Sequence, residues 1–186
     1  EFNSGKSSLI NALLGAEVLE EGVTPTTATV NLLRYGDTFG EQKVDDGFSI
    51  INYPLELLKE INFVDSPGTN ALNREHERLT MDYVPRSDHV LFISSADRPM
   101  TDSERQFLER IISWGKKISI VINKADILEN PEAVEQVLNF SKESAKHILG
   151  HEPEVFLVSA RLAQRSNRTD DAQEKQSLRD ASGINE

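Results

Sequence analysis

A glycine, a lysine and three serines stand together near the start of the sequence, where their chemistry suits them to hold phosphate. Residues 4–8 read Ser-Gly-Lys-Ser-Ser, which matches the end of the phosphate-binding pattern G-x-x-x-x-G-K-S/T. In that pattern, backbone N–H groups at a helix N-terminus donate to phosphate oxygens. We expect Lys6 to lie against the β- and γ-phosphates and Ser7 to give its hydroxyl to Mg²⁺. Taken alone, the run is also what an exposed helix cap would show.

An aspartate followed by a Pro-Gly turn marks a second position with metal and phosphate chemistry. Asp65 follows the apolar run 61–64, and Ser66, Pro67 and Gly68 come next. A carboxylate at the carboxyl end of a strand lies where doubly wound sheets bind ligands. Asp65 is therefore expected to hold the hydration shell of Mg²⁺, and the Gly68 N–H can approach the γ-phosphate because no side chain intervenes. A plain Pro-Gly turn is the alternative for this tetrapeptide.

The run Asn-Lys-Ala-Asp at residues 123–126 carries the chemistry of base selection. It directly follows the apolar run 118–122. The Asp126 carboxylate can accept hydrogen bonds from both N1–H and the exocyclic amine of guanine, whereas adenine offers an acceptor at N1 and no amine beside it. Lys124 is expected to lay its aliphatic stem over the base, and Asn123 to brace neighbouring loops. These residues predict a guanine pocket.

The last of the four motifs is Ser159-Ala160-Arg161, which follows the apolar run 155–158. A backbone N–H there, which we assign to Ala160, is expected to reach guanine O6. Each of the four motifs is common by itself. Because all four occur in the required order, each at the end of an expected strand, they predict a GTPase that binds GTP or GDP together with Mg²⁺.

A threonine-rich segment between the first helix and the next strand is the expected switch over the γ-phosphate. Residues 24–28 read Thr-Pro-Thr-Thr-Ala. We expect Thr27 to bind Mg²⁺ through its hydroxyl and to position water through its carbonyl, with Thr26 as second choice; an ordinary Thr-rich turn is the alternative. Thr69, rather than Gln, follows Gly68. The water-positioning Gln of Ras-like proteins is therefore missing, and hydrolysis must use another device.

Helical and strand-like segments alternate along the chain and would position these motifs. Near-continuous apolar runs at 89–94 and 118–122 are typical of strands buried on both faces of a parallel sheet. Further strands are expected at 29–35, 48–53, 61–64 and 155–158, and helices at 6–14, at 74–83, from 101 and at 130–149. We expect 36–47 to be a polar hairpin or loop, and 29–35 and 48–53 to be antiparallel neighbours. The alternation predicts an α/β fold of the P-loop NTPase type, with a mostly parallel sheet and helices on both faces.

The motifs define one domain over residues 1–163, followed by a polar tail over 164–186. The tail has few aliphatic residues, and we expect a helix leaving the domain or a mobile linker. The first glycine of the phosphate-binding pattern would fall one residue before Glu1, so the first strand of the domain is also expected before residue 1. We therefore expect a longer polypeptide, because a sheet without a central strand should not fold independently.

Composition excludes several other classes of protein. The chain has 186 residues, slightly more than the roughly 150 of a typical domain. Of these residues, 38% are apolar, which is too large a share for a disordered chain. Lys and Arg number 20 against 31 Asp and Glu, and the net charge of −11 disfavours binding to nucleic acid. The chain has no cysteine, which excludes thiol catalysis and thiolate metal sites. No apolar run approaches the roughly 20 residues that span a bilayer.

Several of these runs together resemble the GTPase domain of dynamin-related proteins. They lie at residues 2–15, 22–27, 65–70 and 95–101. The likeness is to the bacterial and plastid Fzo-like, mitofusin-related branch, in particular its chloroplast members, and it covers residues 1 to about 163 in motif order. The resemblance implies a large GTPase whose domains pair as a homodimer across the nucleotide face, which stimulates hydrolysis. It also implies a helical stalk and a membrane-inserting region, outside this chain, that remodel or fuse membranes.

The resemblance further implies a catalytic role for Asn3, since a phosphate-loop residue at that position supplies part of the catalytic stabilisation in the family. Conventional dynamins carry Ser there. The predicted catalytic residues are Asn3, Lys6 and Thr27, and the predicted metal ligands are Ser7, Thr27 and Asp65. The predicted nucleotide-binding residues are Asn3, Ser4, Gly5, Lys6, Ser7, Ser8, Gly68, Asn123, Lys124, Asp126, Ser159 and Ala160.

By the same resemblance, the protein is expected at a chloroplast membrane, the thylakoid or inner envelope, or else in a bacterial cytoplasm peripheral to the membrane. The competing hypothesis is an Era-type ribosome-assembly GTPase switch that binds RNA through an attached domain. A third hypothesis is a GTP-bound scaffold with little turnover, which the missing Gln permits. The net charge and the run Ser-Ala-Asp-Arg-Pro at 95–99 favour the first, and no nucleic acid partner is expected.

Overall fold

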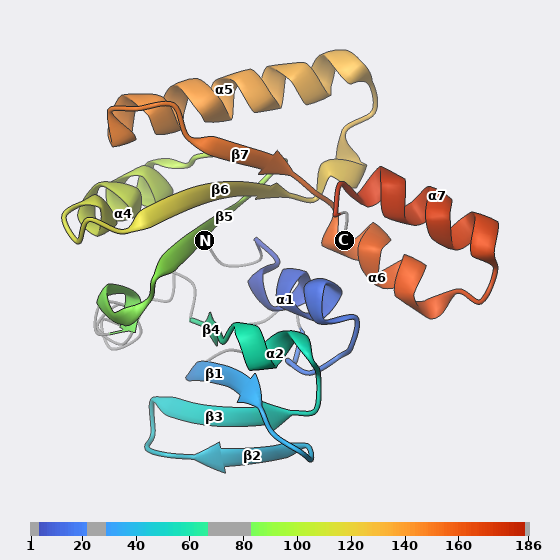
Figure 1. The fold of residues 1–186 in the computed structure, drawn as a ribbon. Coiled ribbons are helices and arrows are strands. Elements are labelled where there is room, and N and C mark those ends of the chain that lie inside the picture. The colour runs from blue at the N-terminus through green and yellow to red at the C-terminus, as the bar shows by residue number, and fades with distance from the viewer. Residues whose placement is uncertain (1–3, 22–28, 67–82, 185–186) are drawn as a thin grey trace.

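The computed structural model describes residues 4–21, 29–66 and 83–184, and the described strands form two sheets (Figure 1). One sheet is parallel and has the strand order β5-β6-β7, with β5 (His89–Ser95), β6 (Lys117–Asn123) and β7 (Glu154–Leu157). The other is mixed and has the order β2-β3-β1-β4, with β1 (Val30–Tyr35), β2 (Gly40–Lys43), β3 (Phe48–Tyr53) and β4 (Phe63–Asp65).

The described helices are α1 (Lys6–Leu14), α2 (Leu57–Glu60), α4 (Asp102–Ile112), α5 (Pro131–Leu149), α6 (Ala160–Arg168) and α7 (Ala172–Ser182), with short 3₁₀ turns η1 (Val84–Arg86) and η2 (Ala125–Ile127).

Strand β6 is the middle strand of the parallel sheet, and it is buried because its sequence is apolar on both faces. Ile120 and Ile122 are fully buried on one face, and Val121 is buried on the other. Strands β5 and β7 lie on either side in parallel register, with Ile120 opposite Phe92 of β5. The predicted parallel pairing is confirmed, and β6 is buried on both faces as predicted. The prediction of burial on both faces was wrong for β5, in which Leu91 is 44% exposed.

Helices cover both faces of the parallel sheet (Figure 1). On one face, Leu108 and Ile111 of α4 and Ala145 of α5 are fully buried in a core shared with β5 and β6. On the other face, α1 and α6 pack around Val121. Burial of these apolar stripes is the main stabilising term for such elements. The predicted α/β fold with helices on both faces is confirmed.

Capping residues set where α4 and α5 begin. Thr101 and Glu104 form a capping box at the start of α4. The Thr101 side chain accepts a hydrogen bond from the Glu104 backbone N–H, and the Glu104 side chain accepts one from the Thr101 backbone N–H. At the start of α5, the Asn130 side chain accepts a hydrogen bond from the Ala133 N–H at 2.8 Å, and Pro131 occupies the first helical position. The helix starts predicted near residues 101 and 130 are confirmed.

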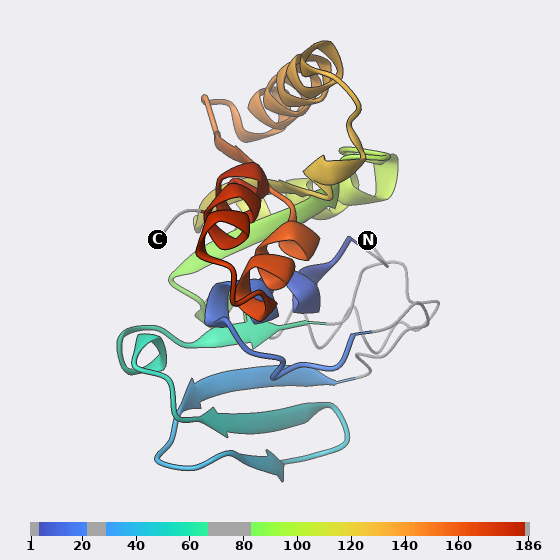
Figure 2. The same cartoon turned by 90° about the vertical axis from the view of Figure 1, so that its right-hand side faces the viewer.

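Helix α1 lies between the two sheets (Figure 2). Leu9 and Ala12 on one side of it pack into the core below the parallel sheet. Ile10 and Leu14 on another side pack with Leu33 of β1. Because α1 is apolar on two sides, it joins the two cores and holds its own N-terminus, with the Gly-Lys-Ser run, near the carboxyl ends of the parallel strands.

The relation between β1 and β3 differs from the prediction. The two strands are neighbours, but they pair in parallel, with Leu33 opposite Ile51. The expectation of an antiparallel pair was wrong because the polar segment between them forms a strand of its own. This strand, β2, pairs antiparallel with β3, with Glu41 opposite Ile51. The chain therefore reverses direction twice and enters β3 in the direction of β1.

The tail after residue 163 also differs from the prediction. Helices α6 and α7 form a hairpin that returns to the parallel sheet, and the Ser159 N–H donates to the Ser182 carbonyl at 2.8 Å. Gly183 has φ 69°, and a Cβ there would lie 2.5 Å from the Leu157 carbonyl oxygen. Residues 172–182 are thus a packed helix rather than one that leaves the domain, and the predicted boundary at 163 falls inside α6. The placement of the domain boundary remains a prediction.

Some predictions concern residues outside the described ranges. The switch segment at 24–28 lies outside them. So does the helix expected at 74–83, except for its last residue, Tyr83. Among the described helices, none combines the length and the apolar character needed to cross a membrane.

Candidate functional site

Three of the predicted motifs are brought into contact by one buried side chain, that of Asn123 at the end of β6. Its Nδ2 donates to the Ser4 carbonyl at 3.0 Å and to the Gly5 carbonyl at 3.4 Å. Its Oδ1 accepts from the Ala160 N–H at 3.0 Å. Asn123 is only 2% exposed, so these hydrogen bonds are shielded from water. Residues separated by more than a hundred positions in the sequence are thereby held in one place.

Glycine is required at position 5 by this arrangement. Gly5 has φ 81°, a left-handed conformation that side chains rarely adopt, and a Cβ on it would lie 2.4 Å from Asn123 Nδ2. The Gly5 carbonyl also accepts the first hydrogen bond of α1, from the Leu9 N–H at 2.9 Å. The backbone N–H groups that follow are at a helix N-terminus, which is a favourable place for an anion.

Lys6 occupies the first position of α1, close to two carboxylates. Burial lowers the pKa of the Lys6 ammonium, because a charged group is disfavoured away from water, and the charges of Asp65 and Glu104 act in the opposite direction. A phosphate placed beside Lys6 would add a further negative charge and so favour the ammonium form. The position is consistent with the predicted phosphate contact.

Ser7 and Asp65 form a hydrogen-bonded pair of oxygen donors. The Ser7 hydroxyl donates to Asp65 Oδ2 at 2.8 Å, although the two residues are 58 positions apart. Asp65 is 2% exposed, and its Oδ1 is a buried atom with no hydrogen-bond partner among the described residues. Burial raises the pKa of the Asp65 carboxyl, while the Ser7 hydroxyl and the Lys6 charge oppose the rise.

The Ser7 and Asp65 oxygens fit the chemistry of Mg²⁺. This ion prefers oxygen ligands and commonly uses one or two protein groups together with water and phosphate oxygens. A buried carboxylate oxygen without a partner is costly, and a cation or its bound water would satisfy it. Among the described residues, no cluster of three or more His, Asp or Glu side chains could hold a metal by itself.

The predicted base-reading residue Asp126 is nearly buried and fully engaged. Its side chain is 8% exposed, and its Oδ2 pairs with Arg161 Nη2 at 2.7 Å. Its Oδ1 accepts a hydrogen bond from the Ser159 hydroxyl at 2.5 Å. The carboxylate is therefore held in a fixed orientation by two residues that flank Ala160, whose N–H, expected to reach guanine O6, donates to Asn123 Oδ1 in this structure.

Lys124 is held in an unusual backbone conformation next to Asp126. It has φ 66°, which is uncommon for a residue with a side chain. Its Nζ lies 3.8 Å from Asp97 Oδ1. The pKa of the Asp97 carboxyl is lowered, chiefly by the hydrogen bond from the Ser95 hydroxyl and further by Lys124. The Lys124 ammonium is thus directed to the loop after β5, and its aliphatic stem spans the distance between the two loops.

Three charged residues that contact the predicted site residues were not predicted from the sequence: Glu21, Asp97 and Arg161. Glu21 accepts hydrogen bonds from the Ser8 hydroxyl at 2.5 Å, from Asn11 Nδ2 at 2.7 Å and from Gln164 Nε2 at 2.6 Å. Asp97 and Arg161 were read only as members of longer runs. Their contacts depend on how loops meet in space, and the sequence carries no local signal for them.

Several predicted site residues lie outside the described part of the chain. These are Asn3, Gly68, Thr26 and Thr27, together with Thr69, where the Gln of Ras-like proteins is missing. Their assigned roles remain predictions from the sequence.

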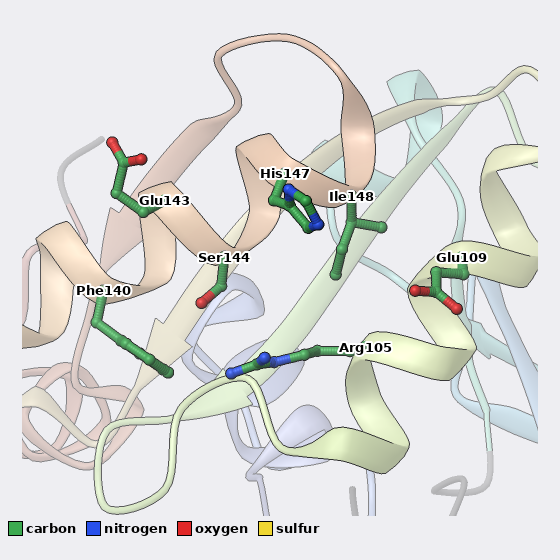
Figure 3. A pocket seen from close by; sticks show the side chains of 7 residues that line it. All are labelled: Arg105, Glu109, Phe140, Glu143, Ser144, His147 and Ile148. Carbon is green, nitrogen blue, oxygen red and sulfur yellow. The ribbon is translucent and has the colours of Figure 1, made fainter.

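A groove of about 420 Å³ lies elsewhere, between α4 and α5 (Figure 3). Arg105 lies over the Phe140 ring, 5.6 Å from its centroid, with Glu143 and His147 on the same helix as Phe140. None of the predicted site residues lines this groove. It is therefore separate from the cluster around Asn123.

The chain is similar to several known proteins. The chain matches the family model described as "Dynamin family" over residues 1–56 and 41–126. It is 43% identical over 169 residues to the "Probable transmembrane GTPase FZO-like, chloroplastic" of Arabidopsis thaliana, a match that covers 88% of this chain and 18% of that protein. It is 30% identical over 184 residues to the "Bacterial dynamin-like protein" of Nostoc punctiforme, covering 74% of this chain and 26% of that protein. The chain thus spans about a fifth to a quarter of the length of these two relatives.

Solved structures show the same fold. A chain from the structure entitled "An oligomerised bacterial dynamin pair provides a mechanism for the long range sensing and tethering of membranes" superposes with a TM-score of 0.77 at 23% identity, covering 96% of this chain and 35% of that chain. Era in complex with MgGDPNP and a segment of 16S ribosomal RNA superposes with a TM-score of 0.61 at 18% identity, covering 100% of this chain and 55% of that chain. At these identities the likeness establishes the fold.

Proposed function

This chain belongs to the dynamin family, and from that premise we propose that it is the GTP-binding and GTP-hydrolysing domain of a dynamin-like membrane-remodelling protein. The observation that carries the proposal is the set of hydrogen bonds made by Asn123. Through them, the loop before Lys6, the loop that contains Asp126 and the Ala160 N–H are joined into one site. One nucleotide can therefore place its phosphates at the first loop and its base at the second.

At the phosphate end, the chain supplies positive charge and N–H donors. Water attacks the γ-phosphate in line, and GDP and phosphate leave. The Lys6 ammonium and the N–H groups at the start of α1 stabilise the negative charge that develops on the phosphate oxygens. Mg²⁺, held by the Ser7 hydroxyl and by Asp65, would neutralise charge on the β- and γ-phosphates.

The remaining catalytic groups are assigned from the sequence. Thr27 would orient the attacking water with its carbonyl and would offer its hydroxyl to Mg²⁺, while the Gly68 N–H would bind the γ-phosphate. Asn3 supplies part of the charge stabilisation from the phosphate loop. Support for these roles comes from motif position and from the family, in which the position of Asn3 has this function.

At the base end, Asp126 selects guanine. Its two carboxylate oxygens accept from N1–H and the 2-amino group. The Ala160 N–H, which donates to Asn123 Oδ1 at 3.0 Å in this structure, would have to share its hydrogen with O6. The Lys124 stem covers one face of the base. Adenine would put its N1 lone pair against a carboxylate oxygen, an unfavourable contact in a site that is largely shielded from water.

We further propose that two of these domains pair across the nucleotide face and that pairing stimulates hydrolysis. The missing Gln at position 69 supports this, because a further group must then complete catalysis. The solved bacterial dynamin pair is described as oligomerised and as tethering membranes, which supports membrane action by a longer protein. A chloroplast membrane, thylakoid or inner envelope, is the proposed location on the strength of the Arabidopsis relative.

The experiment that tests this function is GTP turnover per protein molecule in the purified full-length protein, over a wide range of protein concentration with ATP as competitor. Turnover per molecule that rises with concentration and is insensitive to ATP is the expected result. Slow turnover that does not depend on concentration would contradict the pairing mechanism and favour a monomeric switch or scaffold. The Era-type alternative rests on fold likeness alone, and binding of ribosomal RNA in a filter assay would be needed to revive it.

A further inference from the structure

The carboxylate that is assigned to read guanine has both of its oxygens occupied by groups of the protein itself. Ser159 donates to Asp126 Oδ1 at 2.5 Å, and Arg161 pairs with Asp126 Oδ2 at 2.7 Å. With a side chain only 8% exposed, Asp126 has little access to water. Each oxygen could accept a further hydrogen bond, but because so little of the carboxylate is exposed, a base can approach it only by displacing a partner.

The two partners differ in how easily they can move. Ser159 is completely buried, its N–H donates to the Ser182 carbonyl, and its hydroxyl accepts from the Leu162 N–H at 3.1 Å. It can remain in place, because a carboxylate oxygen has lone pairs for more than one hydrogen bond. Arg161 lies in the first turn of α6 with a side chain that is 71% exposed. It can turn outward into solvent without disturbing the core.

The guanidinium of Arg161 also resembles the edge of guanine that Asp126 reads. Both present neighbouring N–H donors attached to one planar carbon; in this structure Arg161 contacts Asp126 Oδ2 through Nη2, while Oδ1 accepts from Ser159. We propose that Arg161 occupies Asp126 as an internal substitute for guanine and lowers the affinity of the site for the base. The proposal rests on the proposed function, because it takes Asp126 to be the guanine-reading group.

Whether loss of Arg161 tightens or weakens nucleotide binding follows from comparing the nucleotide-free with the nucleotide-bound protein. Without nucleotide, Arg161 stabilises the protein by satisfying a nearly buried carboxylate. With nucleotide, guanine satisfies the same oxygens, and Arg161 returns to water. Removing the guanidinium therefore destabilises only the nucleotide-free state, so that binding becomes tighter. For a charged hydrogen bond with one exposed partner, we expect the Kd for GDP to fall roughly three- to tenfold.

The test is the Kd for GDP of the purified full-length protein and of its Arg161→Gln variant, measured by titration calorimetry. Arg165→Gln is the matched control, because Arg165 lies on the same helix, is 56% exposed and pairs with Glu174 at 3.8 Å. It removes the same charge without touching Asp126, and its Kd should equal that of the wild type. The advantage of Arg161→Gln should also shrink at high salt, which screens the Arg161–Asp126 pair.

A second background shows whether Arg161 acts through Asp126. Asp126→Asn replaces the carboxylate by an amide that can pair with xanthine, whose C2 carries a carbonyl. Titrated with XDP in this background, Arg161→Gln should bring no tightening, since the ion pair is already absent. Tightening of the same size in both backgrounds would overturn the proposal.

The outcomes separate the inference from the function on which it rests. If the wild type binds GDP and Asp126→Asn lowers that affinity, the guanine site stands. A Kd for GDP that is unchanged or weaker in Arg161→Gln would then overturn the inference alone. If the wild type prefers no guanine nucleotide, or if Asp126→Asn leaves the preference intact, the proposed function fails and the inference with it.

Discussion

The two ends of the candidate site are prepared in opposite ways. At the phosphate end, Asp65 has a buried oxygen with no hydrogen-bond partner among the described residues, and burial lowers the pKa of the Lys6 ammonium. At the base end, Asp126 has partners on both oxygens, and Lys124 lies beside the Asp97 carboxylate. Ligand binding thus satisfies groups at the phosphate end, whereas it exchanges partners at the base end. We expect the phosphate end to supply most of the affinity and the base end to supply selectivity.

Lys6→Ala should show the largest effect, because it removes the only side-chain cation that the motif places at the phosphates. We expect at least a roughly hundredfold loss of GTP turnover or nucleotide affinity, since charged contacts in a shielded site are strong. Turnover and the Kd for GDP are the measurements. Lys175→Ala, at an exposed position of α7, is the control for loss of a positive charge. Unchanged turnover in Lys6→Ala would refute the role assigned to the phosphate end.

Asp126→Asn should have the next largest effect, and it should act on selectivity. The amide loses one acceptor, and its N–H₂ group faces the N–H donors of guanine. We expect a roughly hundredfold weaker Kd for GDP, together with tighter binding of XDP than the wild type shows. Competition between the two diphosphates measures the ratio directly. A preference for guanine that survives the substitution would show that the base is read elsewhere.

Asp65→Asn should affect the thermal stability of the nucleotide-free protein and its GTP turnover in opposite directions, which tests the description of the phosphate end. Because the folded-state pKa of Asp65 is raised above its ordinary value, the folded protein binds more protons than the unfolded chain between the two values. Its contribution to stability is therefore present below the ordinary Asp pKa and is lost as pH rises through the raised value. The amide is neutral at every pH, so without nucleotide the variant should melt higher at neutral pH, by roughly 3 °C.

The same Asp65→Asn variant should lose Mg²⁺-dependent turnover, because the amide is a weaker ligand and carries no charge. Thermal melts with and without Mg²⁺ and GDP check both halves, and Asp170→Asn, at an exposed position, is the control for loss of a carboxylate. A variant that melts lower than the wild type in the absence of nucleotide would show that the Asp65 charge is already compensated in the free protein.

Much of the fold could be predicted from the sequence because local patterns and global packing agree. The apolar run of β6, the capping box of α4 and the Asn-Pro start of α5 each specify their element without help from distant residues. The membership in the dynamin family, recognised from the motif runs, is also confirmed. The contacts of Ser7 with Asp65 and of Asn123 with Ser4 link motifs that were expected to meet because each lies at a strand or helix end.

The rest could not be predicted, because it depends on contacts that leave no periodic pattern. Strand β2 has the polar sequence Gly-Glu-Gln-Lys, which has no apolar alternation and is equally typical of a loop. The parallel pairing of β1 with β3 follows from the presence of this strand. The α6–α7 hairpin packs through small residues, with Ala163, Ser166 and Ser182 buried, rather than through an aliphatic stripe. The ion pair of Arg161 with Asp126 likewise could not be predicted, because it depends on how two segments far apart in the sequence meet in space.

Asp97→Asn should have the smallest effect, because Asp97 acts on the base only through Lys124. Its side chain is 44% exposed and lies 3.8 Å from the Lys124 Nζ, so the pair is partly screened by water. We expect the Kd for GDP to rise about twofold, with kcat unchanged because the base contact is the same in the ground and transition states. Asp88→Asn is the control for loss of an exposed carboxylate.

A double substitution decides whether this small effect belongs to the base end. In a Lys124→Met background, the aliphatic stem over the base is kept and the ammonium is gone, so Asp97→Asn should have no further effect on the Kd. Raising the salt concentration should also remove the effect of the single substitution, since an exposed pair is screened. If Asp97→Asn instead weakened binding as much as Lys6→Ala, the base end would contribute affinity on the scale of the phosphate end, and the contrast between the two ends would not hold.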